Sequence, residues 1–353
     1  MAEVQSTVLV TGIAGNLGSR LLPQLPDFRV VGVDLAQPSL KGLFRFESLD
    51  IGEERSCDGL VRLLRETGAA SVVHLAFVID PVRNGILDAE RMWQINVAGT
   101  ARVMEAVSEV NRLGGRITRF IFPSCVSAYG SDLESAVDEE SALDAHTLPY
   151  AIHKREADGV VCSRAEQLGE CRIYLLRPHI FTGASMQNYM VGALRGTPTG
   201  NGSLAQKLQR RGRRLPIVMP AGERYLRNKF QFVHVDDMAR LLAYLLREAP
   251  DDAGLTVLNV AGRGEPLAFA ECARIAKAKL LRLPGRLPCR LALRAAWNLG
   301  ISAVPPEALP YIAGSYTMDT RRLQAFLGSR YQQVMQYTTR EAFADSFRAQ
   351  AAN

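Results

Sequence analysis

Three glycines at intervals of three residues constrain the fold of this chain more than any other feature. They are Gly12, Gly15 and Gly18 in the stretch VLVTGIAGNLGS, residues 8–19. The apolar residues 7–10 predict a buried strand, and the residues after the last glycine can begin a helix. Glycine has no Cβ atom, so backbone N–H groups and a helix start can come close to a pyrophosphate. The candidate cofactor-binding residues of this turn are Gly12, Ala14, Gly15, Asn16, Leu17 and Gly18.

An acid at the end of a predicted second strand indicates which cofactor the turn binds. The strand reads RVVGVD, from Arg29 to Asp34. A carboxylate at this place accepts hydrogen bonds from the ribose of an adenosine. A 2′-phosphate beside an ionised Asp34 would be repelled by on the order of 4 kcal/mol at close range, and residues 35–37 supply no arginine. We therefore predict NAD rather than NADP; the alternative is a glycine turn and a strand-end acid without a ligand.

Strand-like and helix-like runs alternate after this point. Residues 71–77 and 119–124 predict strands, and residues 96–110 predict a helix between them. Such alternation is typical of an α/β protein whose parallel sheet is covered by helices on both faces.

The stretch PYAIHK, residues 149–154, contains a candidate acid/base pair. Pro149 suits the first turn of a helix, and Tyr150 and Lys154 then share one helical face. A phenol has a pKa near 10, so lowering it by about three units needs roughly 4 kcal/mol of differential stabilisation, which a nearby ammonium can supply. The alternative is an ordinary surface helix.

Length and composition fit a globular protein of about two structural units. The chain has 353 residues, of which 47% are hydrophobic and 22% charged. The N-terminal residues support neither a signal peptide nor a membrane span, so we expect a cytoplasmic protein without a membrane partner. Six cysteines are scattered without metal-ligand spacing, so we expect reduced thiols and no metal.

The net charge of +6 is concentrated in the run KLQRRGRR, residues 207–214. The run can be a solvated face or can bind an anionic group such as a phosphate. Because neither interleaved aromatic residues nor a nucleic-acid motif accompanies it, we predict no nucleic-acid partner.

Six segments together resemble the extended short-chain dehydrogenase/reductases, the NAD-dependent epimerase/dehydratase family. They are TGIAGNLG (11–18), HLAF (74–77), NVAGT (96–100), YAIHK (150–154), RPHIFTG (177–183) and FVHVDDMA (232–239). The resemblance implies a Rossmann-type doubly wound parallel sheet with a smaller, discontinuous substrate-binding domain. The sheet domain would comprise residues 1–183 and 230–262, with FQFVHVDD and LNVAG returning to the main sheet. The substrate-binding portion would comprise residues 184–229 and 263–353, and the protein would be a homodimer.

The resemblance also implies roles for individual residues. Tyr150 would be the general acid/base, Lys154 would hold the ribose and depress the pKa of the tyrosine, and Asn96 would help to arrange the site. Asp50 and Ile51 would lie near the adenine. The remaining residues implied to contact the cofactor are Leu75, Ala76, Phe77, Arg177 and Pro178.

The chain departs from the family pattern where a serine or threonine usually helps the catalytic tyrosine. In PSCVSAYG that position, four residues before Tyr129, is Cys125. A thiol is a weaker donor than a hydroxyl. Ser124 or Ser127 can serve instead, and we favour Ser124 because it adjoins the end of a strand.

A second departure concerns the substrate. Many nucleotide-sugar members carry an arginine where this chain has Phe230-Gln231-Phe232, although Arg224, Arg227 or the run 207–214 can replace it. We therefore predict hydride transfer at a secondary alcohol or ketone, first of a nucleotide sugar. The alternatives are net redox on a less polar substrate, as in the hydroxysteroid dehydrogenase and dihydroflavonol reductase branches, and a non-catalytic NAD-binding protein. For His234, Asp236 and Asp237 we expect helix-start contacts and packing.

Overall fold

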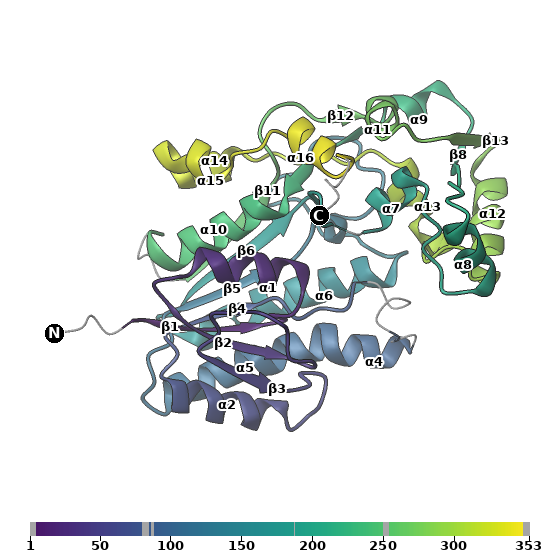
Figure 1. The fold of residues 1–353 in the computed structure, drawn as a ribbon. Helices are drawn as coiled ribbons and strands as arrows, with labels where there is room; N and C mark the ends of the chain where they lie inside the picture. Colours follow the sequence, from purple (N-terminus) through teal and green to yellow (C-terminus); the bar gives the residue numbers. More distant parts are fainter. Residues whose placement is uncertain (1–4, 80–84, 86–87, 187, 250–253, 349–353) are drawn as a thin grey trace.

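A seven-stranded parallel sheet forms the centre of the molecule (Figure 1). The computed structural model describes residues 5–79, 85, 88–186, 188–249 and 254–348. The strands lie in the order β11-β6-β5-β4-β1-β2-β3. Their bounds are β1 Thr7–Thr11, β2 Arg29–Asp34, β3 Arg45–Ser48, β4 Ser71–His74, β5 Arg119–Pro123, β6 Arg172–Pro178 and β11 Gly254–Val260.

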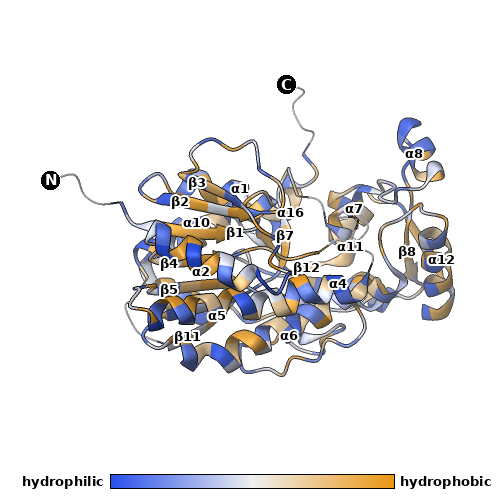
Figure 2. Ribbon diagram, turned by 90° about the horizontal axis from the view of Figure 1, so that it is seen from below, coloured by the Kyte–Doolittle hydropathy of each residue, from blue (hydrophilic) through white to orange (hydrophobic). Residues whose placement is uncertain are grey.

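Helices cover both faces of this sheet, because successive side chains of each strand point to opposite faces. Leu9 and Val72 pack with one set of helices, whereas Val8 and Val73 pack with the other. The first set is α2 Ser56–Thr67, α4 Ala89–Trp93, α5 Gly99–Arg112 and α6 Pro149–Arg164. The second set is α1 Asn16–Leu21, α10 Val235–Arg247, α14 Arg321–Leu327 and α15 Tyr331–Val334. Figure 2 shows the matching hydrophobic colour along the central strands. The predicted α/β fold with a doubly wound parallel sheet is confirmed.

Three small two-stranded sheets lie outside the main sheet. They pair β10 Phe232–His234 with β7 Ile180–Thr182, β12 Leu267–Ala268 with β9 Lys229–Phe230, and β13 Leu280–Leu283 with β8 Ile217–Pro220. The short helices of this part are α7 Tyr189–Arg195, α8 Ser203–Arg210, α9 Glu223–Arg227, α11 Phe269–Ile275, α12 Arg286–Asn298, α13 Leu309–Ala313 and α16 Thr339–Asp345.

Several predicted element positions need correction. LNVAG does enter the main sheet in β11, but FQFVHVDD does not, because β10 pairs with β7. The strand predicted over residues 71–77 ends at His74, and residues 75–77 continue as a loop. Helices α14 and α15 contact β11 and α10, so residues 321–334 lie with the sheet rather than with the substrate-binding portion to which we assigned them. The other domain boundaries stay predictions.

The described residues contain neither a membrane-spanning helix nor a metal-binding cluster. Within those ranges, no helix is both long and apolar enough to cross a bilayer. Over the same residues, no group of three or more histidine, cysteine, aspartate or glutamate side chains is placed to hold a metal ion.

Candidate active site

The glycine turn joins the end of β1 to the start of α1. Gly12 has a φ of +71°, and a Cβ atom there would lie 2.5 Å from the backbone nitrogen of Ala76. A Cβ atom on Gly18 would lie 2.7 Å from the carbonyl oxygen of Gly12. The fold itself therefore requires glycine at these two positions. Gly15 is different, because it is exposed and has an ordinary φ of −69°. A Cβ atom there would have one close neighbour, the carbonyl oxygen of Gly12 at 3.1 Å. Its lack of a side chain keeps the exposed backbone of the turn open to a ligand.

Asp34 ends β2 beside this turn. Its Oδ2 accepts a hydrogen bond from the backbone N–H of Ala14 at 2.9 Å, and its Oδ1 accepts one from Leu35 at 2.8 Å. Each carboxylate oxygen has more than one acceptor site, so the half-exposed Asp34 retains capacity for ribose hydroxyls. The neighbouring Asn16 is also exposed, and its amide donates to the carbonyl oxygen of Ser185 at 3.3 Å. Leu17 packs with the apolar residues beneath α1.

The predicted adenine-side residues follow β3 and adjoin Asp34. The backbone N–H of Leu49 donates to the carbonyl oxygen of Asp34 at 3.1 Å, which brings the next residues alongside. Asp50 forms an ion pair with Arg91 and accepts a hydrogen bond from the backbone N–H of Gly52 at 2.9 Å. Ile51 is buried. Their contact with adenine stays a prediction.

Asn96 holds the loop that follows β4. It is fully buried in the single π-helical turn Gln94–Ala98. Its side-chain oxygen accepts a hydrogen bond from the backbone N–H of Val78 at 2.6 Å, and its amide donates to the carbonyl oxygen of Val78 at 3.0 Å. Asn96 therefore fixes both the N–H and the carbonyl group of Val78, the residue that directly follows Leu75, Ala76 and Phe77. The arrangement agrees with a positioning role for Asn96.

A buried histidine network beneath this loop was not foreseen from the sequence. His74 Nδ1 lies 2.7 Å from Thr11 Oγ1, and its Nε2 lies 3.1 Å from Thr100 Oγ1. Burial, with a smaller contribution from the charge of Lys154, lowers the pKa of His74 to about 3. The ring is therefore neutral at physiological pH and links β1, β4 and α5. A histidine at the end of an apolar strand was the only sequence signal.

Tyr150 and Lys154 meet at the start of α6. The Tyr150 ring lies edge-on to the Phe77 ring with centroids 5.9 Å apart. Lys154 Nζ lies 3.6 Å from the centroid of the Phe77 ring. Lys154 Nζ also donates to the carbonyl oxygen of Pro123 at 2.7 Å. Burial lowers the pKa of Lys154 to about 7 and raises the pKa of Tyr150, so the lowering of the tyrosine pKa that we expected from Lys154 is not seen in the structure. The predicted pair is therefore brought together against the loop that Asn96 holds.

Cys125 is the residue after β5 that contacts Tyr150. The Cys125 thiol lies close enough to the phenol that their interaction adds to the effect of burial in raising the pKa of Tyr150. Ser124 instead donates to the backbone carbonyl oxygen of Lys154 at 3.5 Å and is buried. The Ser127 hydroxyl is buried without a hydrogen-bond partner among the described residues. This geometry favours Cys125 over Ser124, the residue that we favoured from the sequence, as the neighbour of the reacting oxygen.

Comparison with known proteins identifies the family. The signature of the NAD dependent epimerase/dehydratase family matches residues 8–261. The chain belongs to this family.

Curated relatives cover different shares of this family member. A dTDP-D-glucose 4,6-dehydratase of Homo sapiens is 31% identical over an alignment of 175 residues. The alignment covers 45% of this chain and 47% of that protein. The UDP-glucose 4-epimerase GEPI48 of Cyamopsis tetragonoloba is 29% identical over 288 residues, 75% of this chain and 78% of that protein. The chain thus spans about half the length of the dehydratase relatives.

Solved structures of similar fold cover nearly the whole chain. MoeE5 in complex with UDP-glucuronic acid and NAD has a TM-score of 0.66 and 22% identity, covering 97% of this chain and 98% of that one. A UDP-glucuronic acid 4-epimerase from Bacillus cereus, with UDP-glucuronic acid and NAD, has a TM-score of 0.66 and 18% identity, covering 97% of both chains. At these identities the likeness shows the fold.

One predicted cofactor contact of this epimerase/dehydratase family member needs correction. Arg177 Nε and Nη2 donate to the two oxygens of Asp158, each at 2.9 Å, and its Nη1 donates to Tyr129 Oη at 2.9 Å. Arg177 is 5% exposed and Asp158 1%. The guanidinium is therefore committed to joining β6 to α6 and is not free for a cofactor. Pro178 is buried at the end of β6, and its cofactor contact stays a prediction.

His234 and Asp237, at the start of α10, have the structural roles that we expected. His234 caps the helix by accepting a hydrogen bond from the backbone N–H of Asp236 at 3.1 Å. Asp237 accepts hydrogen bonds from the backbone N–H groups of Gln336 and Tyr337 at 3.0 and 3.1 Å. It thereby fixes the C-terminal segment on α10.

Proposed function

We propose that this chain catalyses NAD-dependent hydride transfer at a secondary alcohol of a nucleotide sugar, as an epimerase or a dehydratase. The observation that carries the proposal is the contact of Tyr150 with Cys125 and with the loop after β4, next to Lys154. Further support comes from relatives named as a UDP-glucose epimerase and a dTDP-glucose dehydratase. The residues fit a dinucleotide, because Gly15 leaves the turn open and Asp34 adjoins it.

The chemistry divides between the cofactor and three side chains. NAD, when bound, accepts and returns the hydride. Tyr150 takes the proton of the substrate hydroxyl as a general base and gives one back as a general acid. The protonated form of Lys154 favours the phenolate electrostatically. Cys125, which lies close to the phenol, would donate to the substrate oxygen as charge develops on it.

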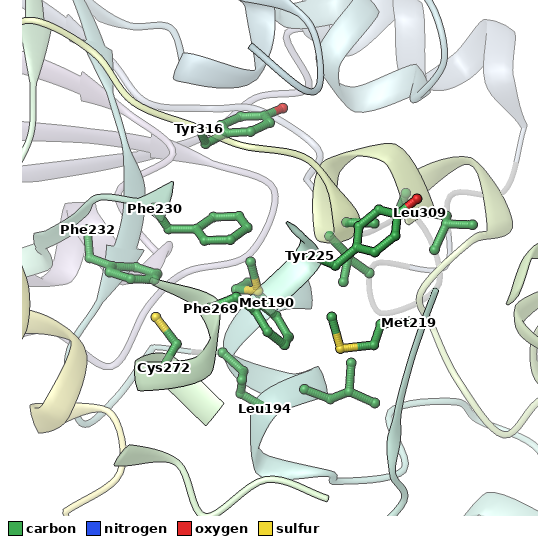
Figure 3. Close-up of a cluster of buried hydrophobic side chains, with 14 of the residues drawn as sticks. Met190, Leu194, Met219, Tyr225, Phe230, Phe232, Phe269, Cys272, Leu309 and Tyr316 are labelled. Atoms are coloured by element: carbon green, nitrogen blue, oxygen red, sulfur yellow. The ribbon is translucent and has the colours of Figure 1, made fainter. Parts of the chain in front are cut away.

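The apolar surroundings of Phe230 favour a second candidate function. Phe230 is fully buried and stacks on Tyr316 with centroids 6.4 Å apart, in the cluster drawn in Figure 3. Apolar packing thus occupies the place where many nucleotide-sugar members of the family carry an arginine for a diphosphate. Net oxidation or reduction of a less polar alcohol or ketone agrees with this packing.

A thermal-shift screen distinguishes the two functions. NAD-loaded protein would be tested against nucleotide sugars, steroids and small ketones. A ligand at 100 times its Kd adds about 2.7 kcal/mol to the free energy of unfolding. Stabilisation by a nucleotide sugar, followed by its conversion, supports the proposal. Stabilisation by steroids or ketones alone would replace it with the second function.

We predict that Cys125→Ser keeps or raises kcat, because a hydroxyl is a better donor than a thiol. Cys125→Ala should lower kcat by about a hundredfold, the usual loss for a donor to a developing oxyanion. Ser124→Ala is the matched control and should change kcat by less than about threefold, because its hydroxyl already bonds a backbone carbonyl. Steady-state kinetics of the three variants, with NAD affinity as the check on folding, provide the measurement. An inactive but folded Ser124→Ala enzyme would restore Ser124 as the working donor.

We predict at least about tenfold tighter binding of NADH than of NADPH, because Asp34 repels a 2′-phosphate. Asp34→Asn removes the charge but keeps an oxygen acceptor. It should reduce the difference between the NADH and NADPH affinities, mainly by improving NADPH binding. Asp34→Ala also removes the hydrogen bond to Ala14 and should weaken NADH binding as well. Titration of cofactor fluorescence measures all six affinities, those of NADH and NADPH for the wild type and the two variants. Tighter NADPH binding by the wild-type protein would refute the cofactor assignment.

We also propose a cytoplasmic homodimer, as in the family that the chain resembles. Light scattering during size-exclusion chromatography should give about twice the chain mass of 38.7 kDa. A mass that stays at one chain over the whole working concentration range would contradict the dimer.

A further inference from the structure

A basic pocket lies between the ends of three helices in the smaller part of the molecule. The ends are those of α7, α11 and α16, and the cavity has a volume of about 530 Å³. Four cationic side chains line it, namely Arg195, Arg214, Lys277 and Arg348. Neither Tyr150 nor Cys125 nor the glycine turn lines this cavity.

Two of these cations hydrogen-bond to backbone carbonyls instead of carboxylates. Arg195 donates to the carbonyl oxygens of Ser346 and Met186. Arg214 donates to the carbonyl oxygens of Arg195 at 2.8 Å and of Ala276 at 3.2 Å. Neither guanidinium has a carboxylate within ion-pair distance among the residues whose placement the structure gives. Burial lowers the pKa of Arg195, as expected for a cation without a counter-charge.

Lys277 and Arg348 complete the charge distribution. Lys277 has no acidic partner in the described part of the chain, whereas Arg348 lies 3.5 Å from Asp345. Asp345 is held elsewhere as well, because it accepts a hydrogen bond from the backbone N–H of Ala184 and lies 3.2 Å from His234 Nε2. The pocket thus contains three positive charges without a paired carboxylate.

The backbone at Lys277 is strained. Its φ of +50° lies in the left-handed region that favours glycine, directly after α11. Glycine would satisfy the helix end without this strain, so lysine at this position costs stability. Strained residues of this kind gather at functional sites.

The structure also divides the basic run 207–214 that the sequence singled out. Residues up to Arg213 belong to α8 and its end, which is largely hydrophilic and lies at the outside of the molecule (Figure 2). Arg214 alone of the run lines the pocket. Its guanidinium is fixed there by the carbonyl oxygens of α7 and α11.

We propose that this pocket is a binding site for a phosphate-bearing small molecule, separate from the Tyr150 centre. The ammonium of Lys277 and Nη1 of Arg214 supply the charge-assisted hydrogen bonds that phosphate oxygens accept. Arg195, whose guanidinium already donates to the carbonyl oxygens of Ser346 and Met186, adds positive charge. Phe347, which lies beside Arg195 at the pocket wall, supplies an apolar surface for the rest of the ligand.

Calorimetric titration of NAD-saturated protein with inorganic pyrophosphate tests the proposal. Saturation with NAD keeps the probe out of the cofactor site. Lys277→Gly should weaken pyrophosphate binding about tenfold. Because glycine suits the backbone there, the same variant should unfold at an equal or higher temperature than the wild type. Weaker binding therefore cannot be attributed to unfolding.

Two further variants locate the probe. Arg214→Gln should weaken binding by at least the same factor. Arg213→Gln is the matched control, because it removes an exposed charge from the same run outside the pocket, and should change the affinity by less than about twofold. Equal affinity in the wild type, Lys277→Gly and Arg214→Gln proteins, or equal weakening by Arg213→Gln, would overturn the proposal. None of these results depends on turnover of a nucleotide sugar.

Discussion

Tyr150→Phe should lower kcat by at least about a hundredfold while leaving NAD affinity within about twofold of wild type. In the proposed mechanism the phenol moves the proton, whereas the ring only packs. The edge-on contact with Phe77 survives the substitution because it involves the ring alone. Steady-state kinetics with the substrate found by the screen, and cofactor titration, provide the two measurements.

Lys154→Met is the informative companion to this variant. Lys154 donates to Pro123 and lies over the ring of Phe77, so its loss should impair both turnover and cofactor binding. A Tyr150→Phe enzyme that kept more than about a tenth of the wild-type rate could not be using this phenol for proton transfer.

Arg177→Met should lower the free energy of unfolding by about 3 to 5 kcal/mol. The substitution leaves the carboxylate of Asp158 buried without its counter-charge, and the desolvation of a lone charge dominates the loss. Tyr129 also loses the guanidinium that lies 2.9 Å from its hydroxyl. Chemical denaturation monitored by circular dichroism provides the measurement.

Two controls separate this effect from a general loss of charge. The double variant Arg177→Met/Asp158→Leu should recover most of the lost stability, because an apolar pair can replace a buried ion pair. Arg282→Met breaks a more exposed pair with Glu223 and should cost less than about 1 kcal/mol. If Arg177→Met instead kept its stability and lost only NAD affinity, Arg177 would be a cofactor residue, as the sequence suggested.

Local rules of chain geometry were enough to predict the first half of the site. The glycine turn follows a strand as expected, and structural clashes require two of its three glycines. The strand ending in Asp34 has the predicted bounds, and α6 begins at Pro149 as predicted. The strand bounds, the turn and the helix start are set within one element or by a short connection, so periodicity and turn chemistry contain the information. The clash of a Gly12 Cβ atom with Ala76 is a long-range contact that the spacing did not show.

The side-chain partners of the site depended on contacts between distant segments. Sequence spacing gives the side of an element on which a residue lies, but not the group that packs against it. Ser124 and Cys125 are adjacent, yet the packing of α6 on β5 places Ser124 against a backbone carbonyl and Cys125 close to the phenol of Tyr150. The sequence assigned Arg177 to the cofactor, but in the structure it forms a buried ion pair with Asp158 on α6.

The same limit applies to larger segments. The alternation within FQFVHVDD predicts a strand, but its pairing with β7 instead of the main sheet is a tertiary choice. The run 207–214 is one basic segment of the sequence, but its residues lie in two different environments. Arg214 donates to the carbonyl oxygens of Arg195 and Ala276, whereas the other residues of the run belong to α8 and its end. The sequence by itself therefore determined the fold class, the glycine turn and the placing of Tyr150 and Lys154 on one helix, each through local periodicity and spacing. The tertiary structure alone decided which hydroxyl, thiol or cation each of these groups meets, because burial and long-range contacts set the partner of a polar side chain.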